Sequence, residues 1–209
     1  MRGSACLAFV AATLAAVTLF SADPAAYTLN GPTWSQPQTP YRINPANLDL
    51  PASSVESAVR SGADAWEQQS AAFRFVYSGL SAQTTNTNDG INLVMFRNAS
   101  SGSAIATTYW WSSGSRILDA DIVFWDAAFR FFAGSSGCSG GFYIEDIAAH
   151  EFGHALGLGH STSPSATMYP SVSACNQGNR TLDADDIAGV MALYPSQLVS
   201  APTGLQVVP

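Results

Sequence analysis

All three histidines of the chain lie in one short segment, residues 150–160, which reads HEFGHALGLGH. His150 and His154 are four residues apart, so on a helix they project from the same face and can bind one ion together. Glu151 lies on the adjoining surface, where it can reach a metal-bound water rather than the metal. The spacing therefore predicts a zinc site with a carboxylate base beside it.

The residues after His154 predict how a third ligand reaches the ion. Gly157 is expected to end the helix, because a continuing helix would carry the next side chains away from the metal. Gly159 is expected to support the same bend, and His160 then arrives from a loop as the third nitrogen ligand. Three protein ligands leave one position of a tetrahedral zinc for water, which is typical of a catalytic zinc. The alternative, exposed histidines without a metal, does not explain the glycines.

These residue types indicate hydrolysis by a zinc-activated water. Zinc lowers the pKa of bound water from 15.7 to about 7 and polarises the scissile carbonyl. Glu151 is expected to take the proton as general base and to deliver it to the leaving amine. The leading hypothesis is a zinc metalloendopeptidase that cuts extended protein substrates. A non-catalytic zinc-bearing binding or adhesion module is the alternative from a different class.

The flanking patterns predict the elements that position this segment. A helix is expected after a capping box formed by Ser53 and Glu56, because apolar or small residues then recur at helical spacing. These are Val55, Val59, Gly62, Ala63 and Trp66. Two more helices are expected over residues 143–156 and about 184–193. The strand candidates are residues 40–43, 72–77, 91–96, 104–111 and 117–125.

Composition limits the class of partner and the compartment. The net charge is −7, and all eight basic residues are arginine, so no basic patch for nucleic acid is expected. One arginine followed by an apolar run over residues 5–20 predicts a signal peptide, residues 1–22, with cleavage between 22 and 26. The run is shorter than the ~20 residues needed to span a bilayer, so no stable membrane insertion is expected after its removal. We predict a secreted, extracellular monomer that acts on proteins or peptides.

The cysteines predict one disulfide in the mature chain. Cys6 lies in the predicted signal, so Cys138 and Cys175 are the two thiols left, and in an oxidising compartment they are expected to pair. Their bridge would tie the loop before the metal-site helix to the loop after it.

The catalytic domain is predicted over residues 27–195. Residues 196–209 are predicted to be a tail or linker, with the possible start of a fibronectin type III module.

Two motifs close to the histidines carry a family resemblance. Ser161 directly follows the third histidine, and Met168 lies in the segment ATMYP, residues 166–170. With them the chain resembles the matrixins, the family of matrix metalloproteinases and their bacterial relatives. Two related metzincin families carry a tyrosine two positions after this methionine, where this chain has Pro170, but a metzincin protease of another family stays an alternative. Further matching positions are Trp34, residues 41–43, Asp185, Asp186, Ile187, Gly189, Leu193 and Tyr194.

The resemblance implies an α+β, metzincin-like zincin fold. It has a twisted mixed sheet of about five strands, three helices, and an active-site cleft between a larger N-terminal and a smaller C-terminal subdomain. Met168 would form the Met-turn under the site, with Asp186 as its brace, and residues 104–111 would be the edge strand that pairs with an extended substrate. The substrate pocket is expected to include Tyr169, Pro170, Ala106 and Tyr109.

The expected metal content is one catalytic zinc. The second, structural zinc of the vertebrate members needs histidines outside the main motif, and this chain has none. Asp119, Asp121 and Asp126 could bind calcium, or they could form the polar face of a strand. The sequence leaves these two interpretations open.

Overall fold

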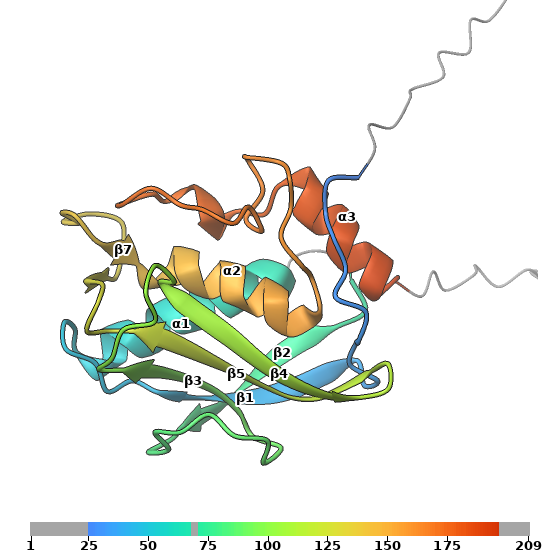
Figure 1. Cartoon of the computed structure of the whole chain (residues 1–209), viewed down its shortest axis with the longest axis horizontal. Coiled ribbons are helices and arrows are strands. Elements are labelled where there is room, and N and C mark those ends of the chain that lie inside the picture. Colours follow the sequence, from blue (N-terminus) through green and yellow to red (C-terminus); the bar gives the residue numbers. More distant parts are fainter. Residues whose placement is uncertain (1–24, 68–70, 197–209) are drawn as a thin grey trace, which may run out of the picture.

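The structure, a computed structural model, describes residues 25–67 and 71–196 of the 209-residue chain (Figure 1). The predicted signal peptide and almost all of the predicted tail lie outside these ranges. In chain order the elements are β1 (Gln38–Asn44), α1 (Ala52–Glu67), β2 (Arg74–Leu80), β3 (Asn92–Arg97), β4 (Ala106–Ser113), β5 (Arg116–Trp125), β6 (Phe131–Phe132), β7 (Phe142–Tyr143), α2 (Ile144–Leu156), the short 3₁₀ helix η1 (Gly178–Arg180) and α3 (Ala184–Leu193).

The main sheet has five strands in the order β2-β1-β3-β5-β4. In this order the strands β2, β1, β3 and β5 run parallel to one another, whereas β4 at the edge runs antiparallel to β5. A tight turn with Gly114 at φ 59° joins β5 to β4, so this pair is a hairpin. The sequence prediction of an α+β fold with a mixed sheet of about five strands and three helices is confirmed.

Helices α1 and α2 cover one face of the sheet and enclose the main core (Figure 1). The predicted apolar face of α1 is buried, including Val55, Val59 and Trp66. Gly62 allows the two helices to touch, because a Cβ at this position would lie 2.6 Å from the Cβ of Ala148. This close contact fixes α2, the helix that carries the histidines, against the rest of the core.

The opposite face of the sheet carries a small apolar cluster and a loop that is held in place by hydrogen bonds. Asp119 and Asp121 are fully buried there, beneath the loop of residues 81–91. Asp121 accepts the backbone N–H groups of Thr87 (2.9 Å) and Leu93 (2.8 Å), and Asp119 accepts that of Asp89 (2.8 Å). Burial raises the pKa of Asp121 to about 7. These carboxylates are therefore not an exposed polar face of the strand.

The start of helix α1 differs from the sequence prediction. Helix α1 begins at Ala52, and the carbonyl of Pro51 accepts the N–H of Ser54 (3.0 Å), so Ser53 lies inside the first turn and the predicted capping box there is wrong. A capping box does form at α3, between Asp183 and Asp186. Within the described ranges, none of the helices combines the length and apolar character needed to cross a bilayer.

Candidate metal and active site

Helix α2 ends at the predicted glycine. Gly157 has φ 107°, a left-handed conformation that glycine adopts without a Cβ penalty, and its N–H bonds back to the carbonyl of His154 at 2.9 Å. A Cβ here would also lie 2.6 Å from the carbonyl oxygen of Pro32. The chain therefore leaves the helix one turn after His154 and returns across its end.

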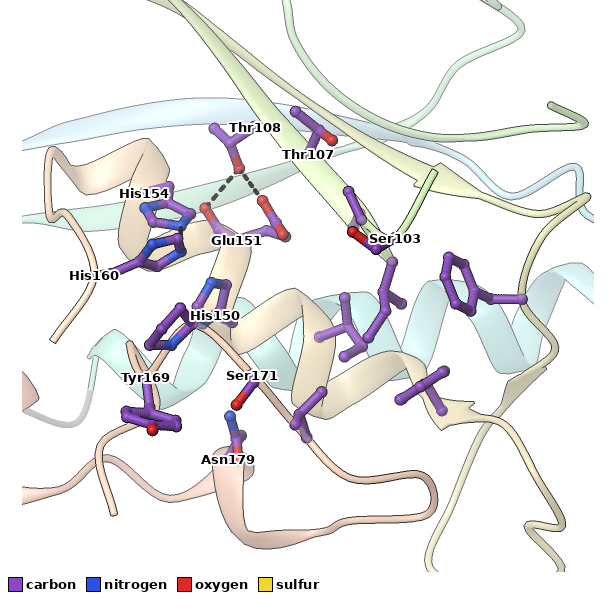
Figure 2. A pocket seen from close by; sticks show the side chains of 18 of the residues that line it. Ser103, Thr107, Thr108, His150, Glu151, His154, His160, Tyr169, Ser171 and Asn179 are labelled. Carbon is purple, nitrogen blue, oxygen red and sulfur yellow. Dashed lines mark hydrogen bonds between the residues drawn. The ribbon is translucent and has the colours of Figure 1, made fainter. Parts of the chain in front are cut away.

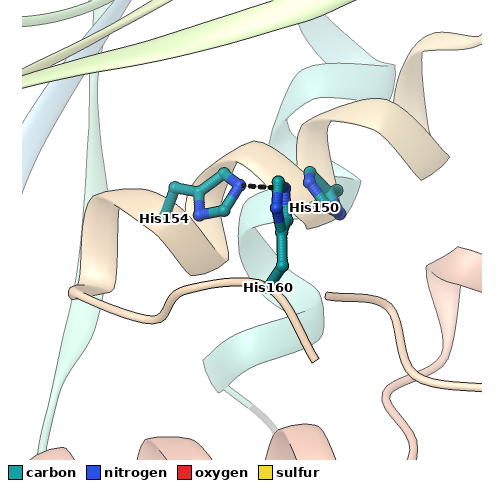
Figure 3. A group of neighbouring side chains, drawn as sticks. All are labelled: His150, His154 and His160. Atoms are coloured by element: carbon teal, nitrogen blue, oxygen red, sulfur yellow. Dashed lines mark hydrogen bonds between the residues drawn. The ribbon is translucent and has the colours of Figure 1, made fainter. Parts of the chain in front are cut away.

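The three histidines converge at this end of α2 (Figure 3). Their ligand nitrogens all lie within 4.8 Å of one another. The Nε2 atoms of His154 and His160 are 3.2 Å apart. Nitrogens that share one tetrahedral zinc at about 2.0–2.1 Å lie roughly 3.3–3.4 Å apart, so this spacing suits the ion.

Backbone carbonyls set the tautomers of two of these rings. The Nδ1 atom of His150 lies 2.7 Å from the carbonyl of Thr167, and that of His154 lies 2.8 Å from the carbonyl of Leu158. A carbonyl only accepts, so each Nδ1 carries the proton and each Nε2 is free to bind a metal. Burial lowers the pKa of His154, which favours the neutral ring that a metal requires. With His160 as the third imidazole, the donor set fits zinc.

The loop that carries His160 is held by the first described residues of the chain. Thr28 donates its hydroxyl to the carbonyl of His160 (2.8 Å) and accepts the N–H of Gly159 (2.8 Å). Asn30 binds the carbonyl of Leu158 through its side chain at 2.9 Å. Gly159 has no left-handed φ; its role is to leave space, because a Cβ would collide with the Thr28 hydroxyl. The expectation that Gly159 supports the bend is therefore replaced by a packing role.

The turn at Met168 lies beneath the site. Met168 is 1% exposed, and its sulfur lies against Gly153 of α2, where no side chain would fit. The buried Asp186 carboxylate accepts the N–H groups of Thr167 (2.7 Å) and Met168 (3.0 Å). Asp186 thus braces this turn as expected, and through the carbonyl of Thr167 it also supports His150.

A cavity of about 740 Å³ opens beside the histidines, between strand β4, helix α2 and the segment after Met168 (Figure 2). Ala106, Tyr169 and Pro170, three of the residues expected in a substrate pocket, line it. Tyr109 does not, because side chains alternate along β4 and Tyr109 packs on the opposite face of the sheet. The lining also includes the apolar residues Ile105, Phe129, Phe142, Ile147 and Val172.

Glu151 is 5% exposed and reaches the same cavity. Its carboxylate accepts a hydrogen bond of 2.6 Å from the hydroxyl of Thr108 on β4. Thr108 was not among the site residues predicted from the sequence. Its position two residues after Ala106, on the same face of an expected edge strand, is the signal that could have identified it.

One disulfide and two ion pairs hold the segment after Met168, which lines one side of the cavity through Tyr169, Pro170 and Val172. Cys138 and Cys175 form the predicted disulfide, which links the loop before α2 to the segment after Met168. Arg180 donates to the buried Asp146 of α2 at 2.6 Å and also pairs with Glu145 at 3.3 Å. The segment between Cys175 and Arg180 is therefore held at one end by the loop before α2 and at the other end by α2 itself.

The comparisons with known proteins agree with this geometry. The chain is 32% identical to human matrix metalloproteinase-20 over 170 residues, which is 78% of this chain and 32% of that protein. It is 32% identical to human matrilysin over 175 residues, 82% of this chain and 63% of that protein, and 28% identical to human neutrophil collagenase over 181 residues, 80% and 34%. The chain thus spans a third to somewhat under two thirds of these relatives. Residues 33–195 match the family model described as Matrixin, and the chain belongs to the matrixin family.

Proposed function

We propose that this chain is a secreted zinc-dependent endopeptidase that hydrolyses peptide bonds in extended protein segments. The observation that carries the proposal is the convergence of three histidine nitrogens beside the buried Glu151, in the lining of one cavity. Membership of the matrixin family supports the same activity. A site built only to hold zinc would not need a carboxylate next to an open metal position.

The residues divide the reaction between them. His150, His154 and His160 hold the zinc, which when bound supplies a Lewis acid that lowers the pKa of water and polarises a carbonyl oxygen. Glu151 accepts a proton from the attacking water and afterwards donates it to the leaving amine. The positions of these side chains on one helix and its following loop keep base and metal in a fixed relation.

The substrate is bound as an added strand. Strand β4 pairs only with β5 in the described sheet, so its other edge has free backbone groups for an extended peptide. Tyr169 and Pro170 line the cavity on the other side, and the side chain that follows the cut bond enters it. The apolar residues in its lining, such as Ile147 and Val172, support an apolar side chain at that position.

The compartment and metal content belong to the same proposal. The Cys138–Cys175 disulfide supports an oxidising, extracellular location, with proteins or peptides outside the cell as substrates of a monomeric enzyme. One zinc is proposed, because among the residues that the structure describes the histidine trio is the one group of three suited to a metal. Both oxygens of Asp121 accept backbone N–H groups, which supports a structural role over calcium binding there.

The test is cleavage of a quenched peptide library by the purified, zinc-loaded protein. We expect cleavage that a chelator abolishes and zinc restores. Glu151→Gln should keep one zinc and lose about 10²- to 10⁴-fold in rate, whereas the matched surface change Glu56→Gln on α1 should have no effect. Stoichiometric zinc without cleavage across the library would favour a binding module, and activity that survives Glu151→Gln would refute the assigned base.

A further inference from the structure

Thr108 connects the edge strand of the sheet to Glu151. Its hydroxyl oxygen lies 2.6 Å from Oε2 of Glu151 and 3.0 Å from the backbone carbonyl of the same residue (Figure 2). A threonine hydroxyl has one proton, so one of the two acceptors must dominate. The carboxylate is the nearer and the more strongly accepting, and the hydroxyl therefore donates mainly to Oε2.

We propose that Thr108 is a positioning residue, which orients the Glu151 carboxylate for proton transfer. The last torsion of a glutamate side chain is broad, so a carboxylate without a partner samples many rotations. A bond to Oε2 fixes that rotation and with it the direction of Oε1. The inference rests on the proposed function, because it gives Thr108 a task only if Glu151 is the base.

The structure makes Thr108 a rigid donor. Its β-branched side chain has a restricted first torsion. Its backbone lies opposite Ile122 in the β4–β5 ladder, so the sheet fixes the position of the hydroxyl. Glu151 is fixed on α2, whose core contacts hold it against the sheet. The hydrogen bond thus joins two elements that cannot easily move apart.

A simpler role is that Thr108 only satisfies a buried acceptor. Glu151 is 5% exposed, and buried polar atoms generally need a partner. That role predicts a loss of stability on removal of the hydroxyl with no change in turnover. The positioning role predicts a loss of kcat at nearly constant KM, because the contact acts on the reacting base and not on substrate binding.

The first measurement is steady-state cleavage of one quenched peptide by zinc-loaded variants. Thr108→Val, which keeps the shape and removes the hydroxyl, should lower kcat by roughly 10- to 100-fold, the worth of a charge-assisted hydrogen bond, with KM changed less than about twofold. Thr108→Ser should recover most of the rate. The control is Ser78→Ala, which removes a hydroxyl bound to the carbonyl of Tyr41 at the opposite edge of the sheet and should leave kcat unchanged.

Two results would overturn the proposal: a Thr108→Val enzyme with wild-type kcat, or a Thr108→Ser enzyme as slow as the valine variant. If the valine variant does not fold, Thr108→Ala takes its place in the same comparison. Catalysis by the wild-type protein is measured alongside, so a complete absence of cleavage is counted against the proposed function and not against Thr108.

The second measurement needs no catalysis. In zinc-free protein, the denaturant midpoint of unfolding is measured for Thr108→Val, Glu151→Met and the double variant. Thr108→Val should lower the midpoint more when Glu151 is present than when Glu151 is methionine, because the methionine variant leaves the hydroxyl only the backbone carbonyl of residue 151 as acceptor. An equal shift in both backgrounds would mean that the hydroxyl and the carboxylate do not interact, and the proposal would fall whatever the activity.

Discussion

Replacing Asp186 with asparagine tests how the turn at Met168 supports the metal site. The buried carboxylate accepts three backbone N–H groups: Thr167 and Asp183 bind Oδ2 at 2.7 Å and 2.9 Å, and Met168 binds Oδ1 at 3.0 Å. An asparagine oxygen can replace Oδ2, but its NH₂ group then faces the N–H of Met168. Two donors meet in a place where the native residue has an acceptor.

The expected loss of stability can be estimated from these contacts. A buried donor without a partner costs about 1–3 kcal/mol, and the loss of charge assistance on the other bonds adds to it. Burial raises the pKa of Asp186, so removal of the charge relieves desolvation and offsets part of the cost. We expect the free energy of unfolding to fall by about 2–4 kcal/mol.

The change should also reach the metal. The carbonyl of Thr167 accepts from Nδ1 of His150 at 2.7 Å, so a displaced turn loosens that ring. Loss of such an outer contact typically weakens metal binding by about 10- to 100-fold. Zinc affinity is measured by competition with a coloured chelator, and stability by denaturant unfolding of the zinc-free protein.

Asp183→Asn is the matched control for this prediction. Asp183 caps the same helix, and its side chain accepts from Asp185 at 3.1 Å. Asparagine caps a helix about as well as aspartate, so stability should change by less than about 0.5 kcal/mol and zinc affinity should not change. If Asp186→Asn keeps wild-type zinc affinity and stability, the bracing argument is refuted.

Three further predictions concern stability. Because burial raises the pKa of Asp121 to about 7 from an ordinary value near ~3.9, the folded state holds this proton more tightly. The contribution of Asp121 to stability therefore falls as pH rises from about 4 to above 7. Asp121→Asn should flatten the dependence on pH of the unfolding free energy of the zinc-free protein. An unchanged slope in this variant would contradict the prediction. Replacing Cys138 and Cys175 with serine should lower the unfolding free energy by roughly 4 kcal/mol, because the bridge closes a loop over a sequence separation of 37. Zinc stoichiometry should be retained. A loss of less than about 1 kcal/mol would contradict this estimate. Gly153→Ala places a methyl group against Met168. The overpacking should cost about 1–3 kcal/mol of stability and so lower the thermal midpoint of unfolding. An unaltered midpoint would show that the turn at Met168 can move aside.

The metal-site helix could be predicted from sequence because its signals are local. The histidine spacing places two ligands on one helical face, and Gly157 ends the helix in the left-handed conformation that only glycine adopts easily. Helix α3 has the predicted bounds, Ala184–Leu193, since its apolar period lies between a capping aspartate and a proline. Each of these features depends on residues within about one helical turn of one another.

The features that the sequence did not predict depend on contacts between distant segments. Nothing local shows that Thr28 will hold the loop of His160, 132 residues away, or that Thr108 will meet Glu151. The error at Tyr109 has a different cause, since the alternation of side chains along β4 already places Ala106 and Tyr109, three residues apart, on opposite faces. The two-residue strands β6 and β7 are too short to give an alternating pattern.

Zinc content and affinity of the purified protein, measured by elemental analysis and chelator competition, test the central claim most directly. We expect one zinc per chain, and a large loss of zinc affinity in each of His150→Ala, His154→Ala and His160→Ala. Wild-type protein that binds no transition metal, or a variant lacking one of these histidines that retains zinc with wild-type affinity, would contradict it.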